Sequence, residues 1–180
     1  MTETKTLFNG RWLKLMARGS WEYAERVNPK GAVIILAVTD ADEVLFVEQF
    51  RVPIQKRTIE LPAGLIGDEA GSEEEDAVAT ARRELEEETG YRPAHVEFVM
   101  QGPSSAGMST EMCAFVRATG LVRVGPGGGH PGEDITVHHV PRRECAAFMA
   151  RKMAEGFAID PKMYAGVYFL DHDEKGNRRG

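Results

Sequence analysis

Hydrophobic and polar positions alternate in short stretches over most of the chain, which predicts a mixture of strands and helices. Residues 10–26 read as short strands that carry Trp12, Trp21 and Tyr23. Residues 32–39 and 43–49 are apolar and β-branched, and the turn at 40–42 predicts that they form a hairpin. Further strands are predicted at 58–61, 96–101, 112–118 and 134–140, and helices at 73–89, 144–155 and 162–170. A glycine-rich loop is expected at 125–129.

The helix expected at 73–89 has one apolar face. At about 100° per residue, this face gathers Ala77, Val78, Ala81 and Leu85. Ser72 and Glu75 predict a capping box at the start of the helix, and Gly90 predicts its end. The helix at 73–89 is therefore the best-defined element of the chain.

Four glutamates, at positions 84, 86, 87 and 88, stand in the last turns of that helix. The helix dipole is negative at this end and like charges repel, so the placement is unfavourable for stability alone. A divalent cation with oxygen ligands would offset the cost. The same wheel puts Glu84 and Glu88 at the edge of the apolar face, Glu87 beside Glu84, and Glu86 toward solvent. A solvated acidic helix end is the alternative interpretation.

These residues resemble the Nudix hydrolase box, G-x5-E-x7-R-E-U-x-E-E-x-G-U, in which U is aliphatic or aromatic. Glu75 is followed, after seven residues, by a segment that matches every position, namely Arg83-Glu84-Leu85-Glu86-Glu87-Glu88-Thr89-Gly90-Tyr91. The first glycine of the box is best matched by Gly64, but ten residues instead of five separate it from Glu75. The loop before the helix is therefore longer than in the box.

Three further segments resemble the ADP-ribose pyrophosphatase branch of that family, namely Glu48-Gln49-Phe50-Arg51, Glu60-Leu61-Pro62-Ala63-Gly64 and Gly132-Glu133-Asp134-Ile135. The resemblance implies an α/β class fold, an α/β/α sandwich with a mixed sheet, over residues 30–180. Residues 1–29 resemble N-terminal strands that pair across a homodimer, and the alternative is that they cap their own sheet. Residues 171–180 are polar and charged, and we expect a flexible tail.

The resemblance also implies a set of metal ligands. The carboxylates of Glu84, Glu87 and Glu88 and the backbone carbonyl of Ala63 would bind Mg²⁺, with Mn²⁺ as a substitute. The catalytic set is Glu84, Glu87, Glu88 and Glu133. Glu133 aligns with an acid near the metal in related enzymes, whereas Pro131 stands where those enzymes have the general base. The base is therefore either Glu133 or a glutamate of the box.

Three residues are candidates for substrate binding. Arg51 ends a predicted strand and matches a diphosphate-binding arginine of the family, with a surface ion pair as the alternative. Trp21 is a candidate for stacking on adenine, as the alternative to packing in the core, which is the default for such a side chain. Glu111 matches a family position that contacts substrate, with simple solvation as the alternative. Arg83 is expected to pair with Glu75 or Glu87 and to play a structural part.

Composition narrows the function. The 180 residues suit one domain, and the formal net charge of −6 argues against a nucleic-acid partner. No signal segment or run of apolar residues predicts a membrane, so a cytoplasmic enzyme is expected. Cys113 and Cys145 are expected to be buried free thiols, and the five histidines form no zinc pattern. The predicted reaction is hydrolysis of ADP-ribose to AMP and ribose 5-phosphate. The alternatives are GDP-mannose or other nucleotide sugars, or a non-catalytic nucleotide-sugar sensor.

Overall fold

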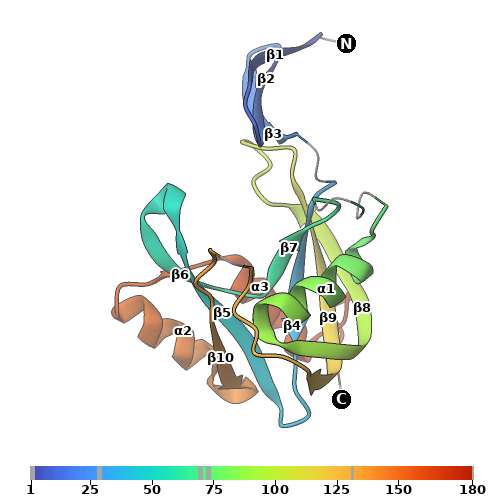
Figure 1. The fold of residues 1–180 in the computed structure, drawn as a ribbon, viewed down its shortest axis with the longest axis vertical. Helices are drawn as coiled ribbons and strands as arrows, with labels where there is room; N and C mark the ends of the chain where they lie inside the picture. Colours follow the sequence, from blue (N-terminus) through green and yellow to red (C-terminus); the bar gives the residue numbers. More distant parts are fainter. Residues whose placement is uncertain (1–2, 28–29, 69–70, 72–73, 131, 180) are drawn as a thin grey trace.

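The computed structural model of the protein describes residues 3–27, 30–68, 71, 74–130 and 132–179. Its first part is an arm of three antiparallel strands that stands out from the rest of the molecule (Figure 1). The arm consists of β1 (Thr4–Asn9), β2 (Leu13–Arg18) and β3 (Trp21–Arg26). The sequence predicted strands only from residue 10 onward, so β1 was not predicted. Ala24 of β3 ties the arm to the body, because its N–H donates to the Met108 carbonyl at 2.8 Å and its carbonyl accepts from Thr110 N–H at 3.1 Å.

The body contains two four-stranded sheets, each of which is mixed. The first has the order β7 (Ala63–Leu65), β4 (Ala32–Ala37), β9 (Met112–Arg123) and β8 (Tyr91–Pro103), with β4 and β9 parallel. The second has the order β10 (Thr136–Pro141), β5 (Glu43–Arg51), β6 (Lys56–Glu60) and β11 (Ala158–Ile159), with β6 and β11 parallel. All other neighbours are antiparallel.

Helices lie on opposite sides of these strands (Figure 1). Val33 and Ile35 of β4 pack with Leu85 of α1 (Ala77–Thr89) in one apolar cluster. Ile34 and Leu36 point the other way, into a cluster shared with α2 (Cys145–Ala154) and α3 (Lys162–Asp171). Short 3-10 turns at Val52–Ile54 and Arg142–Glu144 complete the body. The predicted α/β/α sandwich is confirmed, because apolar side chains on both faces of a strand require cover on both sides.

Residues 32–39 and 43–49 were predicted to form a hairpin, but the two strands are not neighbours in one sheet. The turn forms, since Asp42 N–H donates to the Thr39 carbonyl at 3.0 Å and Thr39 N–H donates to the Glu43 carbonyl at 2.9 Å, but the pairing goes no further than the bridge between Val38 and Val44. β4 continues into one sheet and β5 into the other. Both strands are buried on both faces, and their neighbours come from distant parts of the chain.

The predicted start of the box helix is also wrong. α1 begins at Ala77, and its N-cap is Asp76, whose carboxylate accepts from the N–H groups of Val78 and Ala79 at 2.9 Å each. Asp caps a helix as well as Ser does. Ser72, the predicted cap, lies outside the described residues. The Glu75 carboxylate accepts from the Thr80 hydroxyl at 3.1 Å, within the first turn of the helix.

Several smaller expectations can be compared with the structure. Cys113 and Cys145 are free and buried, as predicted. Within the described residues, no helix combines the length and the apolar character needed to cross a membrane. Beyond α3 the chain folds back, and Arg179 lies 2.8 Å from Glu97. The predicted flexibility of this tail and the dimerising part of the arm stay predictions.

Candidate functional site

One cavity of about 750 Å³ opens between α1, the ends of the central strands, the loop before β10 and the start of α3. Six residues singled out from the sequence line it, namely Arg51, Ala63, Glu84, Glu88, Glu111 and Glu133. Two do not: Glu87 lies beside the cavity, and Trp21 lies on the arm. The volume is in the range typical of sites for small molecules.

The acidic end of α1 faces this cavity as the helical wheel predicted. Glu88 is 6% exposed, and its Oε2 accepts from the backbone N–H of Ala63 at 3.1 Å. Glu84 lies against Gly64, where an added Cβ would come within 2.1 Å of the Glu84 carboxylate. Only glycine leaves room there. Glu86 points outward and pairs with Arg92 at 2.9 Å, which confirms the prediction that Glu86 faces solvent.

Burial makes the ionised forms of these acids unfavourable. It raises the pKa of Glu84 to about 7, although the neighbouring Arg83 guanidinium opposes the change. Burial also raises the pKa of Glu88 well above its usual value, and the negative charges of Glu84 and Glu133 act in the same direction. The two carboxylates therefore share a site that would be stabilised by a cation.

The glycine-rich loop offsets part of the cost at this helix end. The N–H groups of Gly128 and Gly129 donate to the carbonyls of Glu88 and Glu87 at 2.8 Å and 3.0 Å. Gly127 has a φ of 70°, and a Cβ there would lie 2.5 Å from the Thr89 carbonyl carbon. The loop thus satisfies carbonyls that a helix end leaves unpaired. The sequence predicted a glycine-rich loop at 125–129, but its contact with the helix end was not predicted.

Arg83 holds the acidic turn together rather than pointing into open solvent. Its guanidinium lies 3.5 Å from Glu75, 3.1 Å from Glu87 and 3.0 Å from Glu84. Pairing with Glu75 and Glu87 was predicted, and both contacts are present. Glu87 also lies 3.4 Å from Nε2 of His130.

Arg51 enters the cavity from the end of β5. Its Nε and Nη2 donate to the two carboxylate oxygens of Glu60 at 2.7 Å each, and the Thr58 hydroxyl also donates to Glu60. Burial alone would raise the pKa of Glu60, but the contacts with Arg51 and Thr58 outweigh it and hold that pKa below its usual value. The sequence analysis gave a surface ion pair as the alternative to phosphate binding by Arg51. Arg51 does form an ion pair, with Glu60, but the pair lies inside the cavity and not on the outer surface.

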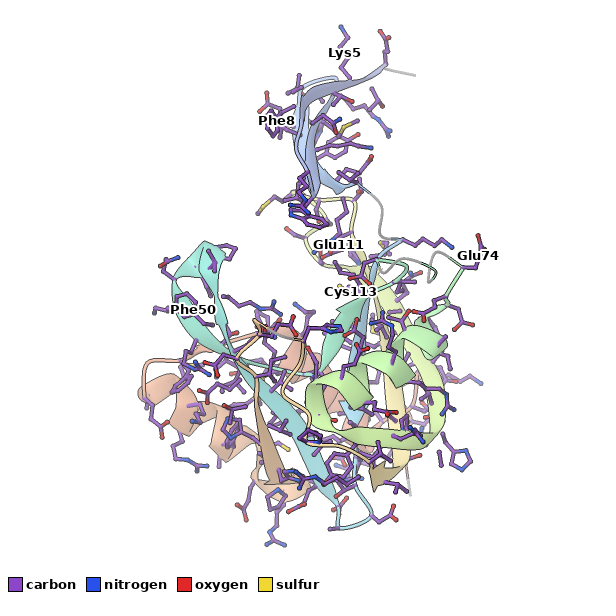
Figure 2. All side chains as sticks on the ribbon, viewed as in Figure 1. Lys5, Phe8, Phe50, Glu74, Glu111 and Cys113 are labelled. Atoms are coloured by element: carbon purple, nitrogen blue, oxygen red, sulfur yellow. The ribbon has the colours of Figure 1, made fainter. Side chains whose placement is uncertain are left out.

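Glu111 lies where the arm meets the body (Figure 2). Its Oε1 accepts from Nε of Arg26 at 2.5 Å, and both residues line the cavity. Simple solvation of Glu111, the alternative, is therefore wrong. Trp21 is 64% exposed, so core packing is wrong within one chain. Together with Tyr23 and the loop at 106–110, Trp21 lines a second, smaller cavity of about 290 Å³.

Glu133 is exposed and lines the cavity at the end of the glycine-rich loop. Its Oε2 accepts from the backbone N–H of His130 at 2.9 Å, and its own N–H donates to the His130 carbonyl at 2.9 Å. Its charge contributes to the raised pKa of Glu88. Pro131, at the position aligned with a base in related enzymes, lies outside the described residues.

The family follows from residues 28–155, which match the NUDIX domain. The chain belongs to the Nudix family. This Nudix chain is 37% identical over 125 residues to a methanol dehydrogenase activator of Bacillus methanolicus, covering 66% of the chain and 65% of that protein. It is 35% identical over 144 residues to an ADP-ribose pyrophosphatase of Mycobacterium tuberculosis, covering 79% of the chain and 66% of that protein. These two matches span just under two thirds of the relatives' own length.

Longer similarity is found with an ADP-sugar pyrophosphatase of Mus musculus, at 29% identity over 196 residues, covering 96% of the chain and 87% of that protein. Among solved structures, the crystal structure of an ADP compounds hydrolase matches with a TM-score of 0.66 and 18% identity, covering 82% of this chain and 80% of that one. The structural match confirms the predicted fold.

Nudix hydrolases generally need divalent metal ions. Within the described residues, no three His, Cys, Asp or Glu side chains converge into a ready-made metal site. The residues present nevertheless fit an ion held mainly by water and substrate, because Mg²⁺ commonly uses one or two carboxylates and keeps several waters. Glu84 and Glu88 supply two, and the missing Cβ of Gly64 leaves room for the first of them.

Several polar residues of the cavity were missed by the sequence analysis, among them Arg26, Glu60, Asp160 and Lys162. Arg26 comes from the arm, Glu60 from β6, and Asp160 and Lys162 from the start of α3, where they pair at 2.6 Å. Glu60 was quoted only as part of a family segment. No local pattern marks the other three, because each is one charged residue in an otherwise ordinary stretch.

Proposed function

We propose that this protein hydrolyses the diphosphate bond of a nucleoside diphosphate linked to a second moiety, with ADP-ribose as the leading substrate and AMP and ribose 5-phosphate as products. One observation carries the proposal: the carboxylates of Glu84 and Glu88 and the guanidinium of Arg51 line the same cavity. Cleavage of a diphosphate requires cations beside the phosphate oxygens and a group that takes the proton of water. The names of the relatives from Mycobacterium tuberculosis and Mus musculus support an ADP-linked substrate.

The proposed cofactor is Mg²⁺, with Mn²⁺ as a substitute. Glu84 and Glu88 would hold the ion, with the carbonyl of Ala63 and the carboxylate of Glu87 as further ligands. When bound, the ion neutralises phosphate oxygens and lowers the pKa of a coordinated water. Glu87 now contacts Arg83 and His130, so it would exchange one of these partners on binding metal.

Arg51 is proposed to hold the diphosphate. Glu60 takes Nε and Nη2, which fixes the plane of the guanidinium and directs its remaining N–H groups. A planar guanidinium binds phosphate oxygens with defined geometry, and a fixed plane loses little entropy on binding. Arg26 and its partner Glu111, in the same cavity, are proposed to contact the nucleoside side of the substrate.

Glu133 is proposed to act beside Glu88, mainly as a metal ligand and in part as the proton acceptor. Two observations support this: both residues line the same cavity, and the charge of Glu133 contributes to the raised pKa of Glu88. The hydrogen bond from His130 N–H holds one of its oxygens and leaves the other available. A base within the box, Glu84 or Glu88, is the alternative.

The arm is proposed to pair with a second copy of the chain. It exposes a set of large apolar side chains, namely Leu7, Phe8, Trp12, Leu13, Leu15 and Trp21. A contiguous apolar surface on a monomer usually marks an interface. In a homodimer Trp21 would reach an adenine from beside the second cavity. Analytical ultracentrifugation of Trp12→Ser and of the unchanged protein tests this, and a monomer in both would exclude the dimer.

We also propose a cytoplasmic location. Both cysteines are free and buried, as is usual for proteins of reducing compartments. Immunoblotting of cell fractions tests it, and recovery in a secreted or membrane fraction would exclude it.

The proposed reaction is tested by incubating the purified protein with Mg²⁺ and a panel of ADP-ribose, ADP-glucose, GDP-mannose and UDP-glucose. Released phosphomonoester is measured with a phosphatase-coupled phosphate assay. The expected result is the highest kcat/KM with ADP-ribose. A preference for GDP-mannose would move the substrate to the other nucleotide sugars. Tight binding of a nucleotide sugar by calorimetry without product would favour the non-catalytic sensor.

A further inference from the structure

The loop that carries Glu133 is held at both of its ends. At one end, Gly128 and Gly129 donate their N–H groups to the carbonyls that end α1. At the other end, Asp134 lies directly after Glu133 and contacts Arg57 of β6. Nη1 of Arg57 is 2.8 Å from the Asp134 carboxylate, and Nη2 is 3.4 Å from the Asp134 carbonyl. Arg57 thus contacts both the side chain and the backbone of Asp134, the residue next to Glu133.

Arg57 is itself held by a buried carboxylate. Its Nε donates to Oε1 of Glu48 at 2.6 Å, and Glu48 is 9% exposed. Oε2 of Glu48 lies 3.0 Å from Nε2 of His138 and 3.5 Å from Nζ of Lys152. β5, β6, β10 and α2 each contribute one residue to this cluster. The Arg57 guanidinium is therefore part of a cluster that joins three strands and one helix of the body.

We propose that Arg57 is a positioning residue that sets the place of Glu133 in the cavity through Asp134. The inference rests on the proposed role of Glu133. Residues 125–129 fix the loop against α1, and two hydrogen bonds join His130 and Glu133 to each other. Arg57 links Asp134, the residue after Glu133, to Glu48 of β5.

Stability and activity should separate when this link is removed. The Asp134 side chain is 80% exposed, and exposed ion pairs contribute little to stability. A displacement of about 1 Å of a group in the reaction can lower turnover by as much as about a hundredfold. The loss of the contact with Asp134 should therefore affect turnover much more than the melting temperature.

The experiment compares Arg57→Gln with the unchanged protein on the best substrate of the panel. We expect kcat to fall about tenfold while KM changes little, and any fall in the melting temperature reports the lost contact with Glu48. Arg57→Lys keeps the charge but lacks the planar guanidinium that contacts Glu48 and Asp134 with different N–H groups. It should therefore show a smaller loss than Arg57→Gln. Arg92→Gln is the matched control, because Arg92 forms an exposed two-bond pair with Glu86, which points away from the cavity.

A double-mutant cycle decides whether Arg57 acts through Glu133. In a Glu133→Gln background, Arg57→Gln should cost nothing further. A full additional tenfold loss there would overturn the proposal, as would an unchanged kcat in Arg57→Gln alone. If Glu133→Gln is fully active, the proposed role of Glu133 fails and the positioning role fails with it, whereas hydrolysis itself stands.

Hydrogen exchange gives a second readout that needs no activity. Amide exchange at residues 132–135 should be faster in Arg57→Gln than in the unchanged protein, and exchange in α1 should be the same in both. Equal exchange at 132–135 would overturn the proposal. If Arg57→Gln does not fold, Asp134→Asn on the exposed loop removes the same charge pair and serves in its place.

Discussion

Replacing Glu84 by glutamine should stabilise the metal-free protein at pH 8 but not at pH 5. The usual pKa of a glutamate is 4.5, and burial raises that of Glu84 to about 7. Between these values the unfolded chain ionises Glu84 while the folded chain keeps it protonated. Stability therefore falls as the pH rises from about 4.5 to about 7, and the loss is complete above pH 7.

The two pKa values set the size of the effect. Their difference corresponds to about 3 kcal/mol, which is an upper limit. For a chain of this length, about 1 kcal/mol shifts the melting temperature by about 2–4 °C. Glutamine also weakens the 3.0 Å contact with Arg83, which reduces the gain. We expect a rise of about 5 °C at pH 8 in Glu84→Gln and little change at pH 5.

Scanning calorimetry between pH 5 and pH 8 in the presence of EDTA measures this. The comparison uses the difference between variant and unchanged protein at each pH, because Glu88, whose pKa is also raised, adds its own pH dependence to both. Glu86→Gln is the control, since Glu86 has a lowered pKa and points to solvent. A difference in melting temperature that is the same at pH 5 and pH 8 would refute the reasoning.

Three further predictions concern catalysis. Glu88→Gln should lower turnover at least about a hundredfold and keep the fold, whereas Glu86→Gln should be almost silent; near-normal turnover in Glu88→Gln would remove it from the metal site. Arg51→Ala should raise KM more than it lowers kcat in steady-state assays, and unchanged kinetics would leave Arg51 only its ion pair with Glu60. Glu133→Gln should lower turnover by roughly 10²–10⁴ and remove the acidic limb of the rate–pH curve if Glu133 is the base. If it is mainly a ligand, high Mg²⁺ or Mn²⁺ should reduce that loss, and a fully active Glu133→Ala would exclude both roles.

Local periodicity was enough to predict much of the site. The relation between Glu84, Glu86 and Glu88 follows from the helix repeat alone, and the structure places the first and last inward and the middle one outward. Gly90 ends the helix with a φ of 77°, which glycine adopts at little cost. The helices at 144–155 and 162–170 were also predicted to within a few residues. Each of these features depends on neighbours along the chain.

The partners across the sheet were decided by tertiary structure. β4 and β5 looked like a hairpin, but each is buried on both faces and takes its sheet neighbours from distant segments. Asp76 caps α1 in place of the predicted Ser72, since both residue types suit the position and local pattern does not choose between them.

The sequence by itself determined the box helix, the direction of its carboxylates and the family. Tertiary structure decided what surrounds them. Glu60 holds Arg51, Arg26 reaches the cavity from the arm, and Gly128 donates to the end of α1. The reason is physical: helical spacing acts between residues a few positions apart, whereas ion pairs and loop contacts form between residues that only the folded chain brings within 3 Å.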